Sequence, residues 1–225
     1  YSIVNKDFEL TIGVDRNHIA DDTLGTYSNR FKMMGEKAAQ HPDKMVFNLL
    51  KRGHETLCYD GQNFFDTDHP VLDENGAVQS VANSFTGSGP AWYLLSTRSV
   101  IKPIIYQTRQ PYEFVALDDP RDANVFWKKE FVYGVDGRSN VGFSLWQLAT
   151  RSTKTLDKAG YKEARDAHQG RKGEGGAPLG LTADLLVVNQ ANEQAALEAI
   201  KAERDAYGAT NVYQGTTEIF VCPWL

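Results

Sequence analysis

The clearest pattern in the chain is a strict alternation of apolar and polar residues near its start. Between Asp7 and Asp15 every second residue is apolar: Phe8, Leu10, Ile12 and Val14. Because successive side chains of a strand point to opposite faces, this pattern predicts a half-buried strand from Asp7 to Asp15. Such a strand needs a partner, which we expect either before Tyr1 or on another molecule.

A helical pattern follows the strand. Apolar residues recur three and four positions apart in two runs: Leu24, Tyr27, Phe31, Met34 and Ala38, and then Val46, Leu49 and Leu50. This spacing predicts a helix whose apolar stripe packs in the core. Proline lacks a backbone N–H, so Pro42 should end or kink the helix near His41. Gly53 is expected to stop the second run.

The middle of the chain predicts loops and short strands. Small and polar residues from Asp73 to Pro90 predict a mobile loop. Strands are expected at 91–95, 104–106, 114–117 and 125–127. A hairpin over 130–150 should turn at Asp136-Gly137, because this pair supplies the positive φ of tight turns. The pair Lys128-Lys129 would then lie on an edge strand, where charge discourages stray pairing.

The last third predicts a small α/β subdomain. Thr155 is expected to cap a helix over 156–168. A glycine-rich loop over 170–180 leads to an apolar strand at 185–188. Asn189 should cap a second helix, over 190–204, and a final strand is expected at 218–222. The order strand, helix, strand is typical of an α/β unit.

Composition and charge exclude several classes of protein. With 225 residues, 41% hydrophobic and 24% charged, the chain has room for one large domain or two small ones, and it is typical of a soluble globular protein. A net charge of -5 argues against a dedicated nucleic-acid binder. No apolar run approaches the roughly 18 residues of a membrane span. The cysteines, Cys58 and Cys222, form no disulfide framework and are expected to be buried thiols in the cytosol.

The segment from Cys58 to Pro70 is the densest cluster of candidate chemistry. Four of its residues are possible metal ligands: Asp60, Asp66, Asp68 and His69. Their spacing matches neither a calcium loop nor a zinc signature. Asp60-Gly61 is also a turn sequence, and aspartates often bond local backbone donors. We therefore expect a set of tight turns, packed by Phe64 and Phe65, rather than a metal site.

The search for nucleophiles and phosphate sites gives no signature either. No G-x-S-x-G elbow occurs, although a catalytic triad assembled in space stays open. Cys58 with His54 or His69 would make a thiolate pair, but a buried thiol is favoured. The glycine-rich run 170–176 lacks the Gly-Lys-Ser/Thr ending of a P-loop, so Arg171 and Lys172 are expected to be solvated. We expect no catalytic, metal-binding or cofactor-binding residue and no cofactor.

Several segments resemble the major head subunits of Mu-like phages and prophages. They span nearly the whole chain in order, at 1–9, 21–27, 58–66, 69–71, 92–95, 102–107 and 179–188. The most specific is Cys58-Tyr59-Asp60-Gly61-Gln62-Asn63-Phe64-Phe65-Asp66, followed by His69-Pro70-Val71. The resemblance implies an α+β fold, the tailed-phage major capsid (Hong Kong ninety-seven-like) fold. That fold has a long spine helix, extended β-hairpins and a small α/β subdomain.

The same resemblance implies a division of the chain. Residues 1–152 would form a peripheral-type domain, with part of the extended loop at 1–16 and the spine helix at about 24–52. Residues 153–225 would form an axial-type α/β subdomain. Family members carry further residues before the position of Tyr1. The sequence is therefore expected to be an N-terminally truncated piece that forms few or no shells alone.

The implied function is structural rather than enzymatic. The protein would self-assemble into an icosahedral phage shell that encloses DNA. Its partners would be copies of itself in hexamers and pentamers, a scaffold or other head proteins, and packaged DNA contacted non-specifically, with no membrane. It would reside in the virion capsid after assembly in the bacterial host cytoplasm. Two alternatives stay open: a metal-dependent hydrolase centred on Asp60, Asp66, Asp68 and His69, and a non-viral encapsulating shell protein of the same fold.

Overall fold

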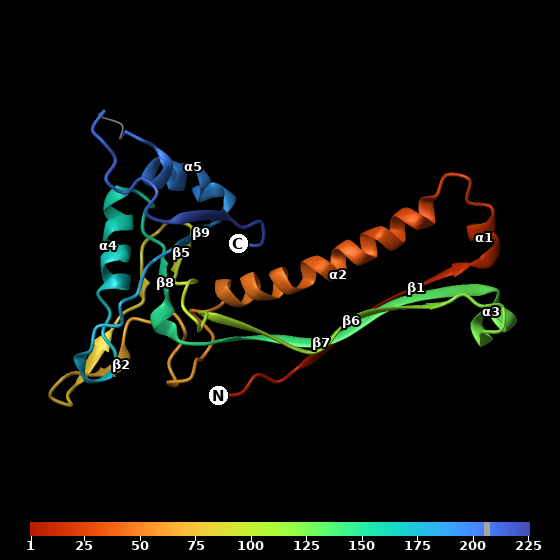
Figure 1. The fold of residues 1–225 in the computed structure, drawn as a ribbon, viewed down its shortest axis with the longest axis horizontal. Coiled ribbons are helices and arrows are strands. Elements are labelled where there is room, and N and C mark those ends of the chain that lie inside the picture. Colours follow the sequence, from red (N-terminus) through yellow and green to blue (C-terminus); the bar gives the residue numbers. More distant parts are fainter. Residues whose placement is uncertain (205–207) are drawn as a thin grey trace. The chain divides into compact units, whose positions relative to one another are not determined.

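The computed structural model describes residues 1–204 and 208–225 and separates into two compact units. The first unit comprises residues 47–105 and 143–225 together with Tyr1, and the second comprises residues 2–46 and 106–142. Both units contain helices and strands (Figure 1). No helix among the described residues is both long enough and apolar enough to cross a membrane.

Strands and helices are interspersed along the chain. The strands are β1 (Lys6–Asp15), β2 (His69–Leu72), β3 (Val78–Val81), β4 (Ser84–Phe85), β5 (Trp92–Leu95), β6 (Ile104–Leu117), β7 (Glu130–Phe143), β8 (Ala149–Ser152), β9 (Leu185–Val188) and β10 (Glu218–Val221). The α-helices are α1 (Arg16–Ala20), α2 (Thr26–Lys51), α3 (Ala123–Lys128), α4 (Lys158–Gln169) and α5 (Glu193–Ala196). Short 3-10 turns occupy Trp146–Leu148, Glu174–Gly176 and Gln190–Asn192, and a π-helical turn follows α5 over Leu197–Lys201.

The second unit is built on a three-stranded ribbon in the order β1, β7, β6. β1 pairs with β7 in antiparallel register, from Lys6 opposite Ser139 to Asp15 opposite Glu130. The predicted strand is confirmed, and three of its four apolar positions follow the alternation, since Val14 is buried and Phe8 and Ile12 are half-buried between exposed residues. Leu10 departs from the pattern, because it is 43% exposed. The expectation that its partner lies outside the chain is wrong, since β7 supplies the partner.

α2 covers both helical runs of the sequence and continues through Pro42. The helix therefore does not end near His41. Proline removes one backbone donor, but the turns on either side keep their own hydrogen bonds. Leu49 and Leu50 are buried as predicted, whereas Leu24 precedes the helix and is 87% exposed. Leu24 is thus not a core residue.

Two predictions for the ribbon are wrong. Residues 125–127 belong to α3 rather than to a strand, so Lys128 and Lys129 mark a helix end and not an edge strand. Asp136 and Gly137 lie inside β7, paired with β1, and make no hairpin turn. Glycine at position 137 instead leaves room for Tyr112, because a Cβ atom there would lie only 2.7 Å from the tyrosine ring.

The first unit contains a five-stranded sheet in the order β10, β9, β5, β8, β4. β10 runs parallel to β9, and β4 runs parallel to β8, while β5 is antiparallel to both of its neighbours. α4 and the helical turns around α5 pack on this sheet through one buried cluster: Trp92, Leu94, Leu156, Tyr161, Ala164, Ala183, Leu186, Val188, Ala196, Ala199 and Ile200. The parallel pair of β9 and β10, joined by helical turns, is the predicted α/β unit.

Other differences in the first unit concern loops and caps. The predicted mobile loop of 73–90 is wrong for 78–81 and 84–85, which form β3 and β4. α4 is capped by Asp157 and not by Thr155; Oδ1 of Asp157 accepts the backbone N–H of Gly160 at 2.7 Å. Asn189 starts the next helical segment as predicted, but that segment ends at Lys201 rather than at 204.

Candidate functional site

The segment from Cys58 to Pro70 connects the end of α2 to β2. Gly61 has a φ of 85°, the left-handed conformation that favours glycine. Oδ1 of Asp60 accepts the backbone N–H of Gln62 at 3.1 Å, and the backbone N–H of Cys58 donates to the carbonyl of Gln62 at 2.8 Å. The predicted Asp60-Gly61 turn is therefore confirmed.

Asp60 brings the candidate side chains of this segment together. Its Oδ2 lies 2.7 Å from Nδ1 of His69, and its Oδ1 accepts the thiol proton of Cys58 at a sulfur–oxygen distance of 3.0 Å. The buried ring of His69 stacks on Trp146, with ring centroids 4.0 Å apart. A thiol, a carboxylate and an imidazole thus lie within 4.8 Å of one another.

The other candidates of the segment lie elsewhere. Oδ1 of Asp66 accepts the backbone N–H of Thr67 at 2.8 Å, as expected for a local turn. Asp68 is exposed, and neither aspartate belongs to the cluster around Asp60. His54 bonds the carbonyl of Lys51 at 3.1 Å rather than Cys58. The set required by the hydrolase alternative is therefore not assembled in the described part of the chain.

The ionisation of the cluster argues against nucleophilic chemistry. Burial, together with the hydrogen bond to Asp60, raises the pKa of Cys58 to about 12. A thiol with this pKa is protonated near neutrality and is a poor nucleophile. Partial burial raises the pKa of Asp60, but hydrogen bonds from Cys58 and His69 outweigh it, so this pKa lies below its ordinary value. The cluster is a hydrogen-bonded turn around one carboxylate.

A second cluster of buried polar residues surrounds Arg171, and the sequence did not predict it. Arg171 is only 3% exposed, so the expectation of a solvated charge is wrong. Its Nη1 donates to the carbonyls of Gln147 and Ala149 at 2.7 and 2.8 Å, and its Nη2 donates to Oγ1 of Thr150 at 2.6 Å. Gln147 lies in the 3-10 turn of residues 146–148, which no pattern in the sequence indicated, and Ala149 is the first residue of β8.

The Arg171 group contains a serine–histidine pair without catalytic geometry. Oγ of Ser96 lies 2.7 Å from Nε2 of His168, while Nδ1 of His168 faces Oγ1 of Thr150 at 2.9 Å. A catalytic triad would place an orienting acid at that second nitrogen. Ser96 and His168 are also buried, and burial lowers the pKa of His168 to about 3. The pair therefore stabilises the core and does not act on a substrate.

His168 should make the fold sensitive to acid. Its pKa in the folded protein is about 3, below the ordinary 6.5, so the unfolded chain binds the proton first as the pH falls. Stability present above pH 6.5 is lost progressively towards pH 3, by about 2 kcal/mol at about pH 5. A His168→Gln variant cannot take up this proton. The difference in unfolding free energy between wild type and this variant should therefore be smaller at about pH 5 than at about pH 7, by about 2 kcal/mol.

Urea unfolding at about pH 7 and about pH 5 measures this change in the deficit. His18→Gln, at an exposed histidine, is the matched control and should show no such change. If His168→Gln lowers the free energy of unfolding by the same amount at both pH values, His168 does not have the lowered pKa that burial is expected to cause.

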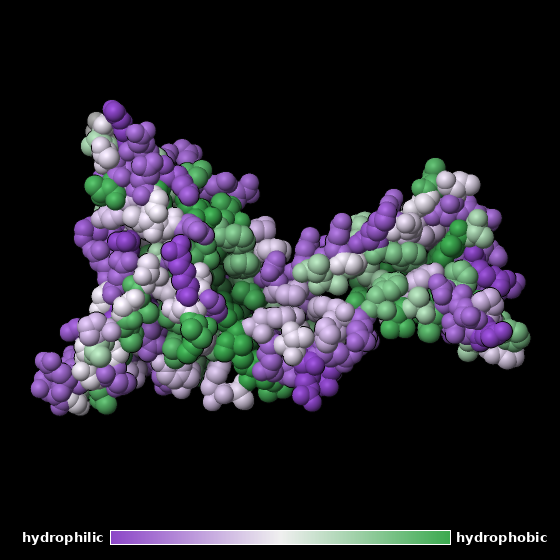
Figure 2. Space-filling model, viewed as in Figure 1, coloured by the Kyte–Doolittle hydropathy of each residue, from purple (hydrophilic) through white to green (hydrophobic). Residues whose placement is uncertain are grey.

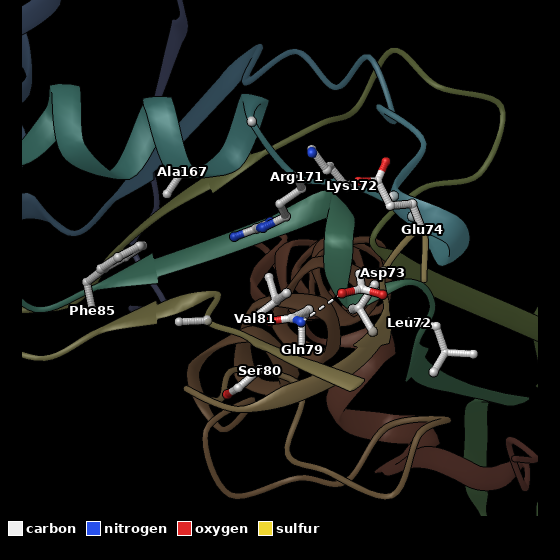
Figure 3. A pocket seen from close by; sticks show the side chains of 15 residues that line it. Leu72, Asp73, Glu74, Gln79, Ser80, Val81, Phe85, Ala167, Arg171 and Lys172 are labelled. Carbon is white, nitrogen blue, oxygen red and sulfur yellow. Dashed lines mark hydrogen bonds between the residues drawn. The ribbon is translucent and has the colours of Figure 1, made fainter. Parts of the chain in front are cut away.

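A pocket of about 510 Å³ adjoins Arg171 (Figure 3). Its walls come from the β2–β3 hairpin and from residues 170–173 and 176. Asp73 and Glu74 line it together with Arg171 and Lys172, and Oδ2 of Asp73 accepts a hydrogen bond from Nε2 of Gln79 at 3.0 Å. Because both signs of charge line the pocket, it offers no selective site for phosphate, in agreement with the missing P-loop ending.

Large exposed apolar side chains are the other notable feature of the second unit. Phe126 and Trp127 on α3 are 67% and 78% exposed, and further exposed residues lie on the ribbon and on α2: Leu10, Met33, Phe114, Val115 and Leu117. Hydrophobic residues reach the surface of this unit in Figure 2. Exposed apolar groups in such number are typical of a surface that contacts another protein.

This chain is similar in sequence to proteins of phage heads. The family model described as "Mu-like prophage major head subunit gpT" matches residues 1–225. The major capsid protein of Escherichia phage Mu is 38% identical over 240 residues, covering 100% of this chain and 77% of that protein. The Mu-like prophage FluMu major head subunit of Haemophilus influenzae is 38% identical over 210 residues, covering 90% of this chain and 68% of that protein.

Solved structures agree with these sequence relationships. A chain of the procapsid of bacteriophage JBD30 has a TM-score of 0.85 and 44% identity, covering 98% of this chain and 76% of that one. A chain of the JBD30 capsid has a TM-score of 0.86 and 32% identity, covering 99% and 75%. The predicted α+β capsid fold is confirmed by this likeness. The chain therefore belongs to the family of Mu-like prophage major head subunits.

Proposed function

We propose that this chain acts through repeated contacts with copies of itself, arranged in rings of five and six within a closed phage head. As a member of its family it is a structural major capsid protein and not an enzyme. Identical subunits can close a shell when each presents different patches that fit one another. Its place is the virion shell, and assembly would occur in the cytoplasm of the bacterial host.

The exposed aromatic pair on α3 is the observation that best supports this proposal. Phe126 and Trp127 pack edge to face with ring centroids 4.9 Å apart, yet both remain largely exposed. Water-exposed aromatic rings are poorly placed in an isolated subunit, whereas aromatic anchors commonly dominate the energy of protein interfaces. We infer that α3 buries these rings against a neighbouring copy.

The same proposal divides the chain into two domains. Residues 1–152 would form the peripheral-type domain, with part of the extended loop at 1–16 and the spine helix at about 24–52. Residues 153–225 would form the axial-type subdomain. The second compact unit falls wholly within the first of these regions, and it holds the ribbon and the larger part of the longest α-helix, whereas the first compact unit contains residues of both regions.

Other partners of the head are also proposals. A JBD30 capsid structure is described as decorated with minor capsid protein trimers, and by that likeness we infer that this shell binds further head proteins or a scaffold. The enclosed DNA would be contacted without sequence preference. A net charge of -5 disfavours tight binding to the phosphate backbone, so the inner surface need only tolerate the duplex.

Electron microscopy of the full-length protein tests the proposal. Wild type is expected to form closed shells of uniform size, whereas Trp127→Glu should remain as small oligomers, because a charge would have to be buried at each repeated contact. Residue 127 is 78% exposed, so the subunit itself should fold normally.

Gln190→Glu, an equal increase in negative charge at an exposed position of the first unit, is the matched control and should assemble. Wild type that stays monomeric at high concentration would refute the shell function. Shells formed equally well by Trp127→Glu would instead refute only the role of α3.

A further inference from the structure

Cys58, Asp60 and His69 form a cluster that the shell function does not use. Each supplies an atom that binds metal ions, and the three atoms lie within 4.8 Å of one another. The geometry points to a binding site for a single zinc-like transition-metal ion, held by Sγ of Cys58, the carboxylate of Asp60 and Nδ1 of His69. Such an ion would brace the turn after α2 against the start of β2.

The ligand chemistry selects the kind of metal. A thiolate with an imidazole suits zinc and its spectroscopic substitute cobalt, which accept sulfur and nitrogen ligands together. Calcium and magnesium prefer sites made of oxygen alone. Three protein ligands leave one tetrahedral position for water. Solvent access exists, since the side chain of Asp60 is 11% exposed.

The three ligands are held in place without the ion. Leu57 and Asn63 form an isolated β-bridge across the turn, which fixes Cys58 and Asp60 relative to each other. His69 is fixed by its pairing with Val81 in the β2–β3 hairpin and by its stack on Trp146. A preorganised set of ligands binds metal more tightly than a mobile one, because less conformational entropy is lost on binding.

The present hydrogen bonds show how the ion would enter. The thiol proton of Cys58 and the ring proton of His69 both point to the carboxylate of Asp60, so two protons occupy the position of the cation. On binding, Cys58 releases its proton to solvent and His69 moves its proton from Nδ1 to Nε2, a buried atom that has no hydrogen-bond partner among the described residues and would carry this proton without an acceptor. One proton is released for each ion, and no oxidation or reduction takes place.

The required movement is small. Zinc ligands lie about 2.0 to 2.3 Å from the ion, so two ligands of a tetrahedral site are about 3.3 Å apart. The present separation of 2.7 Å between His69 and Asp60 must therefore widen by roughly 0.6 Å. The three ligand atoms lie within 4.8 Å of one another, so the most distant pair must also close towards this spacing, and the side chains of Cys58 and Asp60 both rotate on binding. The expectation of no metal rested on spacing along the sequence, whereas this site depends on the fold of the turn.

Cobalt titration of the full-length protein, after removal of metal by a chelator, tests the site. We expect saturation at one ion per chain, release of one proton per ion and the intense absorption band of a thiolate bound to cobalt. Cys58→Ser should abolish the band. Loss of a residue that only hydrogen-bonds to a metal ligand typically weakens metal binding by about 10- to 100-fold. Loss of the ligand Cys58 itself should therefore weaken zinc binding by more than about 100-fold.

Cys222→Ser is the matched control, since Cys222 is the second buried thiol, and it should keep the band. Zinc X-ray absorption of the wild type provides a readout that does not depend on the folding of any variant. One sulfur ligand per zinc ion supports the site. The proposal is overturned by no sulfur or two sulfurs, by no band at saturating cobalt, or by a band that depends on Cys222 and not on Cys58.

Discussion

Replacing Phe64 with alanine is expected to lower the free energy of unfolding by about 4 kcal/mol. Phe64 is fully buried, and its ring stacks on Phe143 with centroids 3.8 Å apart and meets Phe65 edge to face at 4.9 Å. Alanine would remove these contacts and leave a cavity that the rigid turn cannot close. Urea unfolding followed by tryptophan fluorescence measures the loss.

Phe126→Ala is the matched control for this substitution. The same side chain is removed, but from a position that is 67% exposed, so the change in stability should stay within about 0.5 kcal/mol. If the shell proposal holds, Phe126→Ala should weaken assembly, whereas Phe64→Ala should weaken the subunit. Equal losses of stability in the two variants would contradict the assignment of Phe64 to the core.

Replacing Arg171 with methionine is expected to lower the free energy of unfolding by about 3 kcal/mol. Methionine fills much of the volume but leaves the carbonyls of Gln147 and Ala149 without the donors they have now. Each buried polar group left unpaired costs about 1 to 3 kcal/mol, and relief from burying the guanidinium offsets part of this. Thr150 keeps a partner in His168, so it adds little.

Lys172→Met is the control, because it makes the same chemical change at the next residue, which is exposed. Its stability should remain within about 0.5 kcal/mol of wild type. An Arg171→Met variant as stable as Lys172→Met would mean that the guanidinium is not needed to pair those carbonyls.

The regular elements of this fold could be predicted where one pattern ran long enough. The alternation over 7–15 and the helical spacing over 24–50 each extend over several repeats, and β1 and α2 occupy those regions. Three apolar residues at 125–127 are too few to separate a strand from a helix, and they form part of α3. The resemblance to Mu-like head subunits supplied the capsid fold, which periodicity alone did not.

The candidate site could be predicted only in part. The sequence named Asp60 and His69 as possible metal ligands, but it grouped them with Asp66 and Asp68 because these are neighbours along the chain. The turn at Gly61 instead brings Cys58 onto Asp60, and the β2–β3 hairpin fixes His69 beside it. The burial of Arg171 was missed for a similar reason, since it depends on carbonyls more than twenty residues away.

The pairing of β1 with β7 also limits how such ribbons can change in length. The ten residues of β1 pair with β7 one by one and without a bulge, and side chains alternate between the two faces. Loss of one residue from β1 would move Val14 and its apolar neighbours to the opposite face. Loss of two residues would keep every face and shorten the strand by about 7 Å. Insertions and deletions in pairs are therefore the changes that preserve this ribbon, and chimeras with related head subunits should be joined at positions of equal parity.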